Sequence, residues 1–67
     1  MSKVCYNNLF KLLIDKGMKK SEFARLCKLS APTISKLNKN EYVSMDVLVR
    51  ICEGLECQLS DIVEIKK

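Results

Sequence analysis

The sequence predicts an all-α fold, a compact bundle of five short helices that forms a single domain over residues 1–67. Apolar residues recur every three or four positions along most of the chain, which is the spacing of one helical face. Helix-capping residues stand between these segments, and only 63–65 has the pattern of a strand, which could pair weakly at an edge. The predicted helices span 4–16, 20–27, 31–39, 44–55 and 59–63.

The first predicted helix, 4–16, carries two apolar stripes. Leu9, Leu12 and Leu13 form the face that we expect to enter the core. Gly17 follows and suits the left-handed conformation that ends many helices. The second stripe has four-residue spacing, and a small bundle does not easily cover both. It consists of Tyr6, Phe10 and Ile14.

Residues 19–40 contain the most informative pattern of the sequence. They are typical of two short helices joined by a tight turn, with Leu29 as the apolar residue in the turn. Ser30 is a good N-cap for the helix that follows, and Pro32 falls in its first turn, where no backbone donor is missed. This is the outline of a helix-turn-helix at about 20–39, whose second helix can enter a DNA major groove. The apolar faces consist of Phe23, Ala24 and Cys27 before the turn and Ile34 and Leu37 after it.

The last third of the chain predicts one longer helix and one short helix. Asn40 suits a left-handed end of the third helix. Ser44 is a good N-cap, and Asp46 in the following turn suits the positive end of the helix that begins there. A short fifth helix is expected at 59–63. The core face of the longer helix consists of Val47, Leu48, Ile51, Cys52 and Leu55.

Charge is distributed unevenly along the chain, although the net charge is only +4. Between positions 16 and 39 there are seven Lys or Arg and one acidic residue, Glu22. Between positions 41 and 64 there are six acidic residues and one basic residue, Arg50. A basic cluster that coincides with a helix-turn-helix favours contact with phosphates.

The cysteines favour structural thiols over a disulfide scaffold or a metal site. The chain has four Cys and no His. It contains no Cys-x-x-Cys pair, and the spacing of Cys52 and Cys57 is poor for zinc. Cys27 and Cys52 fall on apolar stripes, where a reduced thiol behaves as a small hydrophobic group. Redox sensing and metal binding are the alternatives.

No catalytic constellation occurs in the sequence, so we expect neither an enzyme nor a bound cofactor. The chain lacks His for general-base chemistry, a His partner for any Cys, and a Gly-rich phosphate loop. No apolar stretch approaches the ~18 to 20 residues that cross a bilayer, and the N-terminus has no apolar run of signal-peptide length. These features predict a cytoplasmic location and no membrane partner.

Three segments together form a recognisable pattern. They are Ser-Glu-Phe-Ala at 21–24, Leu-Ser-x-x-Thr-Ile-Ser-Lys-Leu at 29–37 and Leu-x-x-Ile-Cys-x-x-Leu-x-Cys-x-x-x-Asp-Ile at 48–62. In them the chain resembles the small single-domain branch of the Cro and lambda-repressor-like helix-turn-helix family, also called XRE-type. The resemblance implies a five-helix bundle with the third helix as recognition helix. It also implies a DNA-binding transcriptional regulator of bacterial or phage type.

The resemblance further implies which residues meet DNA. The first exposed residues of the third helix and one a turn later would contact bases, where Lys36 can donate to guanine N7 and O6. Few of these side chains carry donors, so DNA shape should add to the readout. The implied base contacts are Ala31, Pro32, Thr33 and Lys36. The implied phosphate contacts are Lys20, Arg25, Lys28, Lys39 and Asn40.

At two turns the chain departs from the family pattern. The family usually has Gly at the turn after the second helix, where this chain has Lys28, and a left-handed Lys costs ~1 kcal/mol relative to Gly. Glu56 stands where Gly is expected after the fourth helix. Neither change threatens the fold.

Double-stranded DNA and a second copy of the chain are the expected partners, with no small-molecule effector evident. A homodimer would place two recognition helices on half-sites about one helical turn apart. The stripe of Tyr6, Phe10 and Ile14 is the expected dimer contact; alternatively, it wraps against Val63 and Ile65. A protein-interaction module on the same fold, antitoxin-like or regulator-binding, is the competing function.

Overall fold

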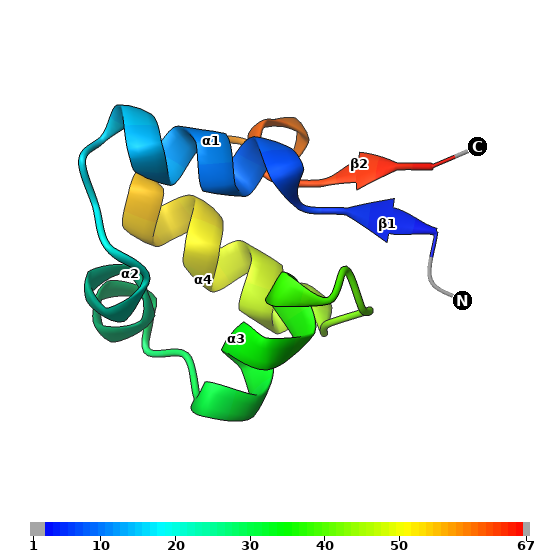
Figure 1. Ribbon diagram of the computed structural model, residues 1–67, viewed down its shortest axis with the longest axis horizontal. Coiled ribbons are helices and arrows are strands. Elements are labelled where there is room, and N and C mark those ends of the chain that lie inside the picture. Colours follow the sequence, from blue (N-terminus) through cyan, green and yellow to red (C-terminus); the bar gives the residue numbers. More distant parts are fainter. Residues whose placement is uncertain (1–2, 67) are drawn as a thin grey trace.

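Four α-helices, one turn of 3₁₀ helix and a two-stranded sheet make up the part of the chain that the computed structural model describes, residues 3–66 (Figure 1). The α2 and α3 helices lie at the lower edge of the view in Figure 1, while α1 and the sheet lie above them and α4 runs between. In chain order the elements are β1 (Val4–Cys5), α1 (Asn7–Asp15), α2 (Lys20–Cys27), α3 (Ala31–Asn38), α4 (Met45–Leu55), η1 (Leu59–Asp61) and β2 (Glu64–Ile65).

The prediction that the first helix begins at Val4 is wrong. Val4 and Cys5 are extended and pair antiparallel with β2, with Val4 opposite Ile65. The pairing continues beyond the strands, where the Lys66 N–H donates to the Lys3 carbonyl at 2.6 Å. The strand pattern predicted at 63–65 is confirmed as β2 at Glu64–Ile65, whereas its partner β1 at Val4–Cys5 was predicted to be helical.

The predicted fifth helix is also wrong, so the described residues form a bundle of four α-helices and not five. Only Leu59–Asp61 is helical after α4, as a single 3₁₀ turn. The Asp61 carboxylate caps this turn by accepting the Gln58 N–H at 2.9 Å. Beyond it the β-branched residues Ile62, Val63 and Ile65 favour the extended conformation that β2 adopts.

The predicted caps are confirmed. The Ser30 and Ser44 side chains accept the N–H groups three residues ahead, at 3.4 and 3.3 Å. Gly17 and Asn40 both have left-handed backbones, with φ of 65° and 56°. These signals are local, because each depends on one residue and the few that follow it.

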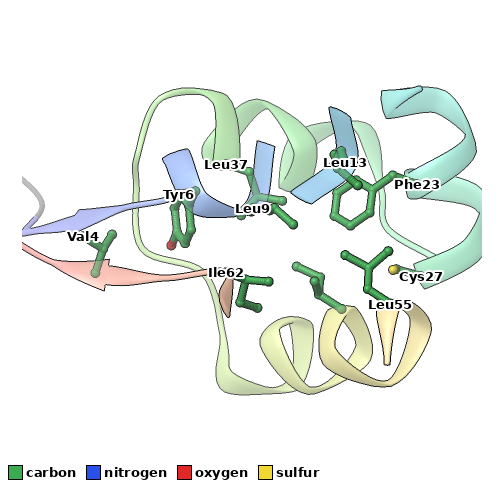
Figure 2. Close-up of a cluster of buried hydrophobic side chains, with 10 residues drawn as sticks. Val4, Tyr6, Leu9, Leu13, Phe23, Cys27, Leu37, Leu55 and Ile62 are labelled. Carbon is green, nitrogen blue, oxygen red and sulfur yellow. The ribbon is translucent and has the colours of Figure 1, made fainter. Parts of the chain in front are cut away.

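The predicted helical faces meet in one apolar core (Figure 2). Leu12, Ile34 and Leu48 were expected within it, but they are only partly buried and pack at its border. The buried residues are Val4, Cys5, Tyr6, Leu9, Leu13, Phe23, Cys27, Leu37, Ile51, Leu55 and Ile62.

The α2 and α4 helices approach each other closely at Gly54. A Cβ atom at this position would lie 2.8 Å from the Cys27 Sγ and 3.5 Å from the Leu26 Cγ. The missing side chain thus lets α4 pack directly on α2, which fixes the first helix of the helix-turn-helix against the core.

Candidate nucleic-acid interface

The turn between α2 and α3 has the left-handed residue that the sequence predicts. Lys28 has φ 57° and ψ 48°, and the next N–H, from Leu29, donates to the Ala24 carbonyl at 2.9 Å. Leu29 is partly buried and packs against the core. The turn is therefore fixed by one backbone bond and one apolar contact, which sets the angle between the helices.

The α3 helix presents one face to the core and another to solvent. Leu37 is 1% exposed, and Ile34 packs at the core border. Ala31, Pro32 and Lys36 are exposed on the outer face. The residues that were predicted to contact bases, Thr33 apart, thus lie free of the core on the helix predicted to read DNA.

Thr33 is the exception, because its hydroxyl takes part in the cap of α3. Its Oγ1 lies 3.0 Å from the Ser30 Oγ, and its N–H donates to the same atom. The residue is half-buried. This leaves Lys36 as the longest-reaching donor among the four predicted base contacts.

Tyr6 is bonded to the turn that follows the C-terminal end of α3. It is therefore not part of the exposed stripe that the sequence predicted on the first helix. It is 2% exposed. Its hydroxyl donates to the Glu41 carbonyl at 2.7 Å, and its N–H donates to the Asn40 Oδ1 at 3.0 Å. The left-handed turn after α3 is therefore bonded twice to the residue between β1 and α1, and burial raises the pKa of the Tyr6 phenol.

Lys20 joins three helices. Its Nζ donates to the Asn38 Oδ1 at 2.9 Å, which links the start of α2 to the end of α3. The same ammonium lies 4.8 Å from the centre of the Phe10 ring of α1, a cation–π distance. The Lys20 head group is thus held in place on the surface.

The stripe proposed for a dimer contact is not continuous in the structure. Tyr6 is buried, Phe10 is half-buried beneath Lys20, and Ile14 is 77% exposed. The prediction of this stripe required residue 6 to be helical, whereas α1 begins at Asn7.

The other predicted phosphate contacts, Arg25, Lys28 and Lys39, are all exposed. Two residues that were not predicted to contact DNA also belong to this region. Asn38 holds Lys20, and Arg50 places its Nη1 3.5 Å from the Lys28 carbonyl while pairing with Asp46 at 2.9 Å. An Asp four residues before an Arg on one helix is the signal that could have predicted the second pair.

A shallow groove of about 500 Å³ separates the two helices of the motif on the solvent side. Its walls combine apolar side chains with short polar ones, without a group suited to catalysis. It is lined by Lys20, Ser21, Ala24, Leu29, Ala31, Ile34, Ser35 and Asn38. Along residues 3–66, none of the helices is long and apolar enough to cross a membrane.

Comparisons with known proteins agree with this geometry. The family model of the Cro/C1-type helix-turn-helix DNA-binding domain matches residues 8–67. A crystal structure of the transcriptional regulator VanUg is 52% identical in sequence, with a TM-score of 0.90, over 92% of this chain and 83% of that one. No curated protein sequence is significantly similar to the chain.

Proposed function

Because the chain belongs to the family of Cro/C1-type helix-turn-helix DNA-binding domains, we propose that it regulates transcription by placing α3 in the major groove of a specific operator. The observation that carries this proposal is the solvent face of α3, where Lys36 is exposed, with the exposed residues Lys28 and Lys39 before and after the helix in the chain. The likeness to the regulator VanUg supports it. Membership of this family favours DNA binding over the interaction-module alternative.

Base readout in this proposal depends mainly on Lys36. A lysine on the groove face donates to guanine N7 and O6. Ala31 and the Thr33 methyl would contact thymine methyl groups, and Pro32 would shape the entry of the helix. With few donors on the face, the deformability of the DNA would supply part of the specificity.

Phosphate contacts would come from both helices of the motif and from the turn after α3. Lys20, which is bonded to Asn38, and Lys39 both lie at the C-terminal end of α3, and Arg25 and Lys28 lie before α3 in the chain. Asn40, whose Oδ1 accepts the Tyr6 N–H, lies in the turn after α3. Backbone N–H groups at the starts of α2 and α3 would add to these contacts.

Selection of duplexes from a random pool, with the wild type and Lys36→Ala, tests this proposal. We expect Lys36→Ala to lose preference at one base pair, at about 1–3 kcal/mol for that pair. Lys11→Ala, which removes an exposed lysine from α1, is the matched control and should select the same site as the wild type. If the wild-type protein shifts no duplex at low salt, the proposed DNA-binding function is wrong.

We also propose that the protein binds as a homodimer, since a two-fold pair of α3 helices matches half-sites one helical turn apart. Within the predicted stripe, Ile14 is the side chain available for such a contact. Ile14→Lys should give a folded monomer with weaker binding to a two-fold site, and Asp15→Lys should not. Light scattering that finds the wild type monomeric both alone and on DNA would contradict the dimer.

A further inference from the structure

Two of the four cysteines meet where α4 ends. Figure 1 shows that α4 begins near α3 and ends beside α1 and α2. Glu56 is left-handed there, and the Cys57 N–H donates to the Cys52 carbonyl at 3.0 Å. A backbone bond that spans five residues in this way brings the side chains on its two sides into contact.

The Cys52 thiol is close enough to affect Cys57. Burial, together with this neighbouring thiol, raises the pKa of Cys57 to about 11. Of the charges nearby, Asp61 raises that pKa further and Lys16 lowers it. Among residues 3–66 no group of three or more candidate metal ligands occurs, so the pair is an isolated dithiol.

Exposure separates this pair from the other two cysteines. Cys52 and Cys57 are half-buried, so small molecules can reach them. Cys5 and Cys27 are 4% and 3% exposed, and they lie in or beside the core. The fold therefore provides one accessible pair of neighbouring thiols and two shielded thiols.

We propose that Cys52 and Cys57 form a reversible oxidation site, which a small-molecule disulfide converts from a dithiol to an intramolecular disulfide. A disulfide needs a Cα separation of about 4.4–6.8 Å, and the backbone bond from the Cys57 N–H to the Cys52 carbonyl holds the two residues close together. This site is separate from the face of α3 and does not depend on the proposed operator.

The reaction balances as two successive exchanges. A thiolate of the pair attacks one sulfur of the small disulfide, which forms a mixed disulfide and releases one small thiolate. The second cysteine sulfur then attacks the mixed disulfide, forms the bond between Cys52 and Cys57, and releases the second small thiolate. Two electrons pass to the oxidant, and the two protons of the protein thiols go to the released thiolates.

Because Cys57 is mostly protonated near neutral pH, oxidation should be slow there, and an equilibrium measurement is the appropriate test. The folded protein is incubated with glutathione disulfide and glutathione in varied ratio, then alkylated and cleaved with trypsin. Both cysteines fall in the fragment 51–66, while Cys5 and Cys27 fall in separate fragments. The expected result is a fragment 51–66 that has lost two hydrogen atoms, together with alkylated Cys5 and Cys27.

Three results would overturn the proposal: glutathione that remains attached to fragment 51–66, a disulfide between two chains, or equal oxidation of Cys5 and Cys27. The variants Cys52→Ser and Cys57→Ser provide the matched controls. Each should stop at the mixed disulfide and never show the loss of two hydrogen atoms. Since the main experiment uses the wild-type chain, it does not depend on the stability of either variant.

Discussion

The turn after α2 and the turn after α4 have the same backbone and opposite charges. Lys28 has φ 57° and Glu56 has φ 53°. The residue after each, Leu29 or Cys57, donates its N–H to a carbonyl five residues back, at 2.9 and 3.0 Å respectively. Glycine would adopt either turn at a cost lower by ~1 kcal/mol.

The difference between the turns lies in their surroundings. Lys28 lies in the motif that carries the basic residues, and its exposed side chain adds to that charge. Glu56 lies in the part of the chain that carries the acidic residues. Backbone geometry is therefore common to the two turns, whereas the charge of the side chain matches that of the surrounding sequence segment.

The largest effect should come from cutting back the buried anchor behind each turn. Leu37 is 1% exposed and holds α3, while Ile62 is 0% exposed and holds the segment after α4. Leu37→Ala and Ile62→Ala should each lower the free energy of unfolding by about 2–5 kcal/mol, measured by urea denaturation. Ile34→Ala, at the core border, should cost less. A much smaller loss of unfolding free energy in one of the two variants would show that the two turns are not equally stabilised by the core.

A smaller effect should come from the third left-handed residue, Asn40, through its partner Tyr6. Tyr6→Phe removes the hydroxyl that donates to the Glu41 carbonyl and should cost about 1–3 kcal/mol, because a partly buried carbonyl loses its donor. It should also weaken DNA binding, since the end of α3 is less firmly held. Tyr42→Phe is the matched control, because the Tyr42 hydroxyl is exposed and accepts the Lys3 N–H.

The same variant has a pH signature. Burial raises the pKa of Tyr6 above its usual 10.0, so the unfolded chain loses this proton first as pH rises. The contribution of the neutral phenol is complete below pH 10.0 and is lost as pH rises through the higher pKa of the folded state. Urea denaturation at increasing pH should show a steeper alkaline loss in the wild type than in Tyr6→Phe. Parallel curves would contradict the buried hydroxyl.

The smallest effect on stability tests the comparison directly. Lys28→Gly and Glu56→Gly should each raise the free energy of unfolding by up to ~1 kcal/mol, because Gly relieves the left-handed backbone. Only Lys28→Gly should weaken DNA binding, and it should reduce the slope of log K against log salt by ~0.9, the contribution of one phosphate contact. Equal effects of the two variants on DNA binding would mean that charge at the turn has no role in it.

Local features of the fold could be predicted from the sequence. Ser30 and Ser44 as N-caps, Gly17 and Lys28 as left-handed residues and the bounds of α2 follow from neighbouring residues alone. The exposure of Lys36 and the burial of Leu37 also follow, since they lie on opposite sides of one short amphipathic helix.

The features that could not be predicted depend on residues far apart in the chain. The pairing of Val4 with Ile65 changes a predicted helical turn into a strand, and it places Tyr6 before α1 instead of on its surface. The contact of Lys20 with Asn38 and Phe10 joins three helices whose relative positions no periodicity specifies.

The pairing of β1 with β2 also bears on the order of folding. Contacts between residues so distant in sequence close a loop that spans nearly all of residues 3–66, and the entropy of that closure delays them. Tyr6 follows β1 directly and holds the turn after α3. We therefore expect the C-terminal end of α3 to become rigid only after β1 has paired with β2. The solvent face of α3 would then be completed among the last steps of folding.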